Sequence, residues 1–206
     1  MIHTPSRRAL LASVGTGATA LLAGCAGDDS PETITDRYPG ERIAEYTVEF
    51  TRSTGDRPPV VAVSADDGTT AGDGAGSTPD PTRSLTLAER DDADAVEFAP
   101  DATNVAAVRR LLAETGFTDE CVFLYQTTIG ECHRLELNDV SRDADGDPNL
   151  DFCTVIRDAD VACEREAREY VAAFVRLPFP GDQVGGYAIG RGSSCDPGPG
   201  DGGESA

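Results

Sequence analysis

Cysteines are the residues of this 206-residue chain with the most distinctive chemistry, and six are present. No two of them form a Cys-x-x-Cys pair, which disfavours a dithiol redox motif and a zinc knuckle. One lies near the N-terminus, and the five that remain allow at most two disulfides. We predict a bridge between Cys132, which opens a strand, and Cys163, in the loop after the neighbouring strand. A second bridge between Cys121 and Cys195 would join the sheet to the C-terminal end, although other connectivities remain open.

An aspartate-rich run between two predicted strands has the oxygen chemistry that Ca²⁺ prefers. It resembles the Asp-rich loops of calcium-binding repeats, and the resemblance implies ligands at alternate positions: Asp143, Asp145, Asp147, Asn149 and Asp151. The run departs from an EF-hand because Gly146 stands at its fourth position, not its sixth, and no Glu stands at its twelfth. A solvated turn, which needs no metal, is the alternative interpretation.

Nucleophilic catalysis is difficult to build from this sequence. The only histidine beyond His3 is His133, and its neighbour Cys132 would point to the opposite face of a strand. A blue-copper site is excluded because it needs two histidines and usually an axial methionine, and Met1 is the single Met. Pairs such as Glu131 and Glu136 could in principle do acid–base work, but with 37 acidic residues coincidence is the better explanation. We therefore predict no enzyme and no resident cofactor.

The charge balance is strongly acidic, with 37 Asp+Glu against 17 Lys+Arg and a formal net charge of −20. All 17 basic residues are arginine. Nucleic-acid binding is disfavoured because no basic stripe is present. Dense carboxylates without lysine or tryptophan resemble the proteins of halophilic archaea, in which molar salt screens the self-repulsion of the folded chain.

The N-terminal stretch has the order of an export signal, with Arg7 and Arg8 before an apolar run too short to span a bilayer. Leu22-Ala23-Gly24-Cys25 resembles the lipobox of lipoproteins. The resemblance implies a twin-arginine signal over residues 1–24, cleavage before Cys25, and a lipid on its sulfur. That lipid would hold the protein at the extracytoplasmic face of the cell membrane. An ordinary cleaved signal with an incidental cysteine is the alternative.

The remaining chain divides by composition. Residues 25–41 read as a flexible tether, residues 42–195 as one β-rich domain, and residues 196–206 as a disordered acidic Gly/Pro tail. Within the domain, the Gly- and Asp-rich residues 64–82 are predicted to form an exposed, mobile loop.

Hydrophobic periodicity predicts the elements of this domain. The helix is expected near 102–115, where apolar residues recur at helical spacing, with Gly116 as a left-handed residue after its end. Strands are expected at 42–52, 60–63, 84–88, 94–98, 122–126, 132–140, 150–157, 170–177 and 184–190. The predicted class is α+β, a mainly antiparallel, sandwich-like meander with one clear helix.

From Asn104 onward, the order of elements resembles a known family, although no chemical motif accompanies it. Strands such as Cys121-Val-Phe-Leu-Tyr-Gln126 and Phe174-Val-Arg-Leu-Pro178 are similar to those of the small β-rich domain associated with bacterial protease complexes, and to haloarchaeal lipoproteins of unassigned function. We expect a non-catalytic, lipid-anchored domain that binds a protein partner or supports envelope organisation. A regulator of a surface protease, a carboxylate-dependent hydrolase and a calcium-stabilised structural module are the alternatives.

Overall fold

The computed structural model describes residues 40–54, 57–63, 82–193 and 195. The predicted signal, nearly all of the tether, Cys25, the loop predicted at 64–82 except Thr82, and the tail lie outside these residues. Among the described residues, no helix has the length and apolar character needed to cross a membrane.

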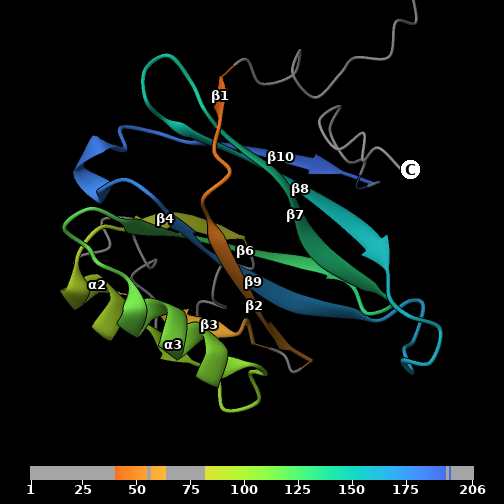
Figure 1. Cartoon of the computed structure of the whole chain (residues 1–206). Helices are drawn as coiled ribbons and strands as arrows, with labels where there is room; N and C mark the ends of the chain where they lie inside the picture. The colour runs from red at the N-terminus through yellow and green to blue at the C-terminus, as the bar shows by residue number, and fades with distance from the viewer. Residues whose placement is uncertain (1–39, 55–56, 64–81, 194, 196–206) are drawn as a thin grey trace, which may run out of the picture. The chain divides into compact units, whose positions relative to one another are not determined.

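A four-stranded antiparallel sheet, here called the central sheet, contains β2 (Thr47–Ser53), β9 (Arg168–Leu177), β6 (Cys121–Gly130) and β4 (Arg83–Leu87), in that order (Figure 1). The strands β6 and β9 each contain a continuous apolar run, residues 121–125 and 170–175, so both of their faces can be buried there. Phe123 and Val175 face one core while Val122 and Phe174 face another. The central sheet therefore has packed material on both sides.

A second sheet, the outer sheet, has the order β1 (Glu41–Arg42), β7 (His133–Arg142), β8 (Pro148–Ile156) and β10 (Ala188–Gly192). Its pairings are antiparallel except that of β8 with β10, which is parallel. One face contributes Leu135, Val140, Leu150 and Phe152 to a core shared with the central sheet, the inter-sheet core. The strand β1 begins one residue before the predicted domain and pairs with the end of β7.

The antiparallel class and the single long helix are confirmed, but the strands do not form a continuous meander. The strands β7 and β8 make the expected hairpin, whereas β6 pairs with β4 and β9 in the other sheet. The reason is amphipathicity. The two apolar faces of β6 require a buried position, while β7 has polar residues on one face and lies in a sheet with only one core.

The helical layer covers the second face of the central sheet. The helix α3 (Val105–Glu114) buries Val108, Leu111 and Leu112 in the helix-side core. The short helix α2 (Arg90–Asp94) and the small sheet of β3 (Val60–Ala62) with β5 (Glu97–Phe98) complete this layer. Only Glu97 and Phe98 of the strand predicted at 94–98 are extended, and α2 is a short helix that the periodicity did not indicate.

Side-chain hydrogen bonds connect both ends of α3 to other elements. Its N-cap residue is Asn104, with φ of 56°, a left-handed conformation that asparagine tolerates. The Asn104 amide donates to the backbone oxygen of Phe50 on β2, over 2.9 Å. At the C-terminal end, Arg90 donates to the carbonyls of Leu112 and Thr115. Gly116 is not left-handed, so its predicted role as a helix terminator is wrong; the Arg90 guanidinium satisfies the last carbonyls instead.

Candidate functional site

The first predicted disulfide is present and fixes one corner of the sandwich. Cys132 lies in the turn after β6, and Cys163 lies between β8 and β9, with 5.2 Å between the two Cα atoms. Backbone hydrogen bonds from Glu131 to Ala167 and from Arg157 to Cys132 close the same corner. With a sequence separation of 31 between its cysteines, this bridge is expected to stabilise the fold by about 2–4 kcal/mol. Because Cys132 is oxidised, it cannot act as a nucleophile beside His133.

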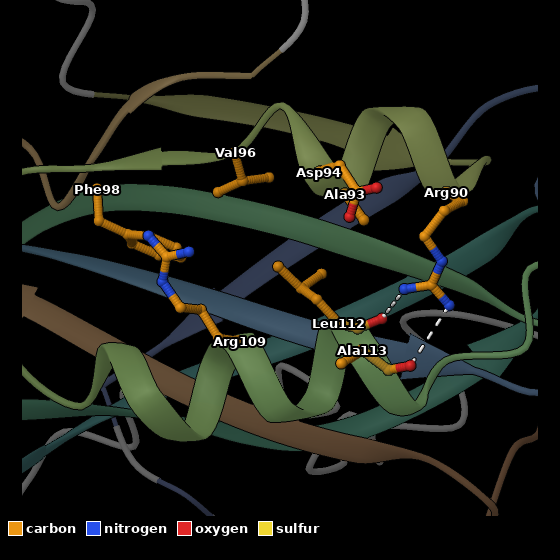
Figure 2. A pocket seen from close by; sticks show the side chains of 8 residues that line it. All are labelled: Arg90, Ala93, Asp94, Val96, Phe98, Arg109, Leu112 and Ala113. Atoms are coloured by element: carbon orange, nitrogen blue, oxygen red, sulfur yellow. Dashed lines mark hydrogen bonds between the residues drawn. The ribbon is translucent and has the colours of Figure 1, made fainter.

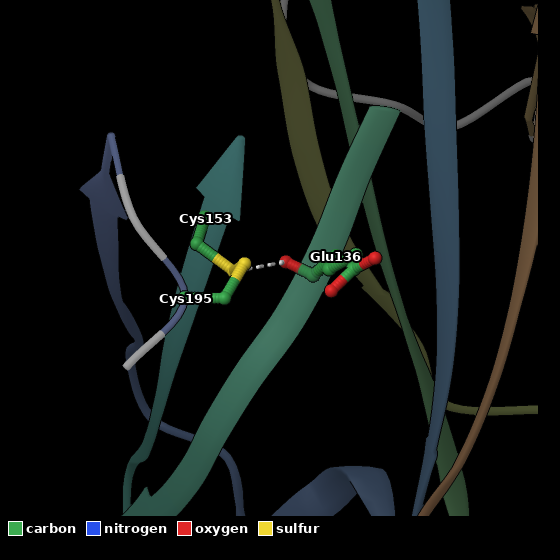
Figure 3. A group of neighbouring side chains, drawn as sticks. All are labelled: Glu136, Cys153 and Cys195. Atoms are coloured by element: carbon green, nitrogen blue, oxygen red, sulfur yellow. Dashed lines mark hydrogen bonds between the residues drawn. A yellow bond between two sulfur atoms is a disulfide. The ribbon is translucent and has the colours of Figure 1, made fainter. Parts of the chain in front are cut away.

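The second predicted bridge, Cys121 to Cys195, is wrong, because Cys195 is bonded to Cys153 (Figure 3). The parallel register of β10 on β8 places Gly192 opposite Cys153, so the residues just beyond β10 arrive beside that cysteine. Cys121 begins β6 in the central sheet, where it is fully buried in the inter-sheet core as a free thiol. Burial raises the pKa of this thiol to about 12; Arg142 acts weakly in the opposite direction.

Glu136 lies opposite Cys153 on the neighbouring strand β7 (Figure 3). Glu136, Cys153 and Cys195 form the one group of three metal-ligand-type side chains within 4.8 Å that occurs in the described part of the chain. The two sulfurs are bonded to each other, so neither is the thiolate that a metal ion would need. In addition, Arg134 donates to the Glu136 carboxylate over 2.5 Å. This group therefore acts as a covalent clasp between β8 and the segment after β10.

The Asp-rich run forms the hairpin between β7 and β8, and its side chains bind backbone amides. Asp143 Oδ1 accepts the amides of Asp145 and Asp147, while Asp147 Oδ1 accepts those of Gly185 and Gly186 at 2.8 and 2.7 Å. A Cβ atom on Gly186 would lie 3.0 Å from the Asp147 carboxylate, so a glycine suits this close approach. The hairpin thereby anchors the segment that leads into β10.

The five predicted calcium ligands do not converge on one point. Asn149 and Asp151 lie within β8, where Asp151 Oδ2 accepts a hydrogen bond from the Asn138 amide at 3.0 Å. No three of the four aspartates bring carboxylate oxygens within 4.8 Å of one another. The hydrogen bonds from backbone amides to the Asp143 and Asp147 carboxylates give this run a structural role that needs no metal.

Three charged side chains, Arg52, Arg157 and Glu169, meet at one end of the inter-sheet core. We call them the buried charge cluster, after the buried Glu169 at their centre. Glu169 on β9 is 2% exposed and forms ion pairs with Arg52 from β2 and with Arg157 beyond β8, the latter at 3.8 Å. Arg52 also donates to the backbone oxygen of His133 at 2.6 Å. The cluster thus connects the end of β2 with the beginnings of β7 and β9.

The electrostatics of the cluster are those of a structural clasp. Burial, followed by repulsion from Arg157, lowers the pKa of Arg52 to about 10, and Glu131 partly offsets this. Arg52 still carries its charge at neutral pH, and so compensates the Glu169 carboxylate. His133 stands at the rim, where its ring lies so close to Gly130 that a Cβ atom there would be 2.9 Å from Nδ1. The opposite charges therefore hold together the ends of β2 and β9 and the residue after β8.

This cluster was not predicted, although the alternation of residues in its two strands indicates it. The alternation of Tyr46, Val48 and Phe50 continues to Arg52, which assigns an arginine to the core face of its strand. Glu169 likewise occupies the core face of β9, two residues before Val171. A charge at a core position predicts a buried partner of the opposite sign.

Comparison of the chain with protein-family models, with curated proteins and with solved structures gave no match. The disulfides, the strand edges and the pocket of this fold are therefore the observations from which a function can be proposed.

Proposed function

We propose that this protein is a non-catalytic domain, lipid-anchored through Cys25 at the extracytoplasmic face of a halophile's membrane, where it binds a protein partner. The observation that carries the proposal is the pair of disulfides, Cys132–Cys163 and Cys153–Cys195, in a domain that follows a signal-like N-terminus. Disulfides of this kind are typical of the oxidising, exported side of the membrane and rare in the cytosol. The acidic composition supports a high-salt environment.

The anchor is tested by the fate of Cys25. In cells making the full chain, we expect the mature protein to begin at Cys25, to carry a lipid mass by intact mass spectrometry, and to sediment with membranes. Cys25→Ser should release the protein into the medium, while Arg7→Lys with Arg8→Lys should keep it unexported with residues 1–24 attached. Cys121→Ser, which removes a different free cysteine, is the matched control and should stay on the membrane. Release of the control, or membrane retention of Cys25→Ser, would contradict the anchor.

An edge of the outer sheet supports a partner-binding role. Within the described residues, β1 covers only Ser141 and Arg142 of β7, so His133–Asp139 has a strand neighbour on one side alone. Such an edge can accept an extended segment of a partner as an additional strand. The edges of the central sheet are less available: Thr103 and Asn104 bind carbonyls of β2, and Tyr187 binds Ser84 on β4.

Site-specific photo-crosslinking in cells tests this mode of binding. A crosslinker in place of Arg134, on the β7 edge, should trap a discrete partner, while one in place of Arg110, on α3, should not. Arg134 and Arg110 carry the same charge and lie on opposite layers of the fold. A partner that proves to be a protease would favour the regulatory alternative, and equal capture at both positions would argue against the edge as a binding site.

A further inference from the structure

A small pocket lies on the helical layer, between α2, β5 and α3 (Figure 2). Its volume is about 180 Å³, below the range usual for drug-sized ligands, so any occupant has to be small. The apolar part is built from Ala93, Val96 and Leu112, all buried in the helix-side core. Phe98 forms one end, and its ring packs against Phe174 of the central sheet at 5.9 Å between centroids. The wall is therefore a rigid part of the core.

Two arginines stand at opposite ends of this pocket (Figure 2). Arg90 is fully engaged, since its guanidinium binds the carbonyls of Leu112 and Thr115 and lies 4.8 Å from the Phe117 ring. Arg109 differs: its guanidinium lies over the Phe98 ring at 5.4 Å, and no hydrogen bond or ion pair to it occurs within the described residues. Stacking on the ring sets the orientation of Arg109 while leaving its N–H groups available.

The charge of the lining is opposite to that of the chain. Two arginines and one carboxylate, Asp94, line the pocket, whereas the whole protein has a net charge of −20. Because Arg90 is bound to carbonyls and Asp94 offsets one positive charge, the Arg109 guanidinium is the group of this lining that can bind a single negative charge. An anion bound by Arg109 would place its apolar body against Phe98 and Ala113, the apolar lining residues that are not buried, where water is displaced from apolar surface.

We propose that this pocket binds a small monocarboxylate with an apolar or aromatic body, with Arg109 holding the carboxylate. The proposal goes beyond partner binding and does not depend on the lipid anchor. The combination of one available, oriented guanidinium with an adjoining apolar wall selects this class over polyanions, which need several cations, and over neutral apolar molecules, which leave Arg109 without an anion.

Calorimetric titration of the full chain carrying Cys25→Ser, in high-salt buffer, tests the proposal with benzoate as the probe and benzamide as its neutral match. We expect benzoate to bind about tenfold more tightly than benzamide. Arg109→Gln should remove that preference, weakening benzoate about tenfold and leaving benzamide unchanged. Arg110→Gln is the matched control, because Arg110 is the neighbouring arginine on α3 and does not line the pocket; it should bind benzoate as the parent chain does.

A second variant keeps the test independent of any single arginine. Ala113 lines the pocket on the exposed face of α3, so Ala113→Leu should fill part of the volume without disturbing the helix, and should weaken both probes. Thermal unfolding verifies that each variant is folded. The proposal is overturned if benzoate produces no saturable heat, if benzoate and benzamide bind equally, or if Arg110→Gln weakens benzoate as much as Arg109→Gln.

Discussion

Glu169 is a buried carboxylate whose two positive partners come from other segments of the chain. Its carboxylate is 2% exposed and is compensated by Arg52 and Arg157. Taking one partner away from a buried ion pair leaves an uncompensated charge, which costs far more than the pair contributes. The contrast with exposed pairs is instructive, because Arg134 and Glu136, with side chains 43% and 38% exposed, are solvated whether or not they meet.

We predict that Glu169→Gln lowers the free energy of unfolding by about 3–5 kcal/mol, measured by denaturant titration. Glu136→Gln, the same change at the exposed pair, should cost less than about 1 kcal/mol. The cost at Glu169 should persist in molar salt, because buried charges are poorly screened. Similar costs for both variants would mean that Glu169 is not buried with its arginines.

Cys121 should be chemically silent in the folded protein. Because its pKa is raised from the ordinary value of 9.0 to about 12, it remains a thiol at pH 8. Iodoacetamide at that pH should leave the native chain without Cys25 unlabelled, and should add one label after denaturation without reductant. Two or more labels on the denatured chain would contradict the two disulfides.

The raised pKa of Cys121 also makes the free energy of unfolding depend on pH, in a direction that can be stated. Above pH 9 the unfolded chain loses the Cys121 proton while the folded chain keeps it, so the unfolded state binds fewer protons and stability falls as pH rises towards 12. Comparison of unfolding at pH 8 and pH 10 should show a smaller loss in Cys121→Ala than in the parent chain. An equal loss in both would contradict the raised pKa.

At the level of elements, β10 depends on contacts that are distant in sequence. Among the described strands it pairs only with β8, in parallel, and it is held before its start by Asp147 and after its end by the Cys153–Cys195 bridge. An edge strand of five residues has little pairing energy of its own. Its position therefore depends on both attachments.

We predict that replacing Cys153 and Cys195 with alanine accelerates hydrogen exchange in Ala188–Gly192 by about tenfold or more, measured by mass spectrometry of peptides. The matched control replaces Cys132 and Cys163, and should accelerate exchange around residues 157–167 while leaving β10 protected. If β10 keeps its protection without the Cys153–Cys195 bridge, the disulfide is not what holds the strand.

For the whole molecule, the net charge is the property with the strongest effect on how folding stability depends on salt. A net charge of −20 with no lysine favours the expanded, unfolded chain at low ionic strength, where the carboxylates repel one another over long distances. The three-layer arrangement concentrates those charges on the surface: among the described residues, Asp151 and Glu169 are the buried ones that carry a charge. Salt therefore acts on the balance between the folded and unfolded states.

We predict that the unfolding temperature rises steeply between dilute buffer and molar potassium chloride, where the Debye length falls to about 3 Å. Scanning calorimetry over a salt series measures the rise. Sucrose, which favours compact states without screening charge, is the control and should produce a smaller increase. A stability independent of salt would contradict the halophilic interpretation of the composition.

Sequence periodicity alone determined the type of most elements. The period of two in Thr47–Ser53 and the period of 3.6 in Val105–Glu114 are local properties, and both elements formed, although the strand predicted at 42–52 begins at Thr47 and residues 41–42 pair in the other sheet. The Cys132–Cys163 bridge was also predictable, because its two cysteines lie in adjoining connections of neighbouring strands. Composition set the sign and size of the net charge, which disfavours a nucleic-acid partner on electrostatic grounds.

Only the tertiary structure decided which strands meet. Burial of apolar faces between segments far apart in the chain places β6 in the central sheet and pairs β10 in parallel with β8. The pairing of Cys153 with Cys195 follows from the position of β10. The same is true of the pocket, whose Arg90 and Arg109 come from separate helices. Periodicity states which face of an element is apolar, but it cannot state which partner will cover that face.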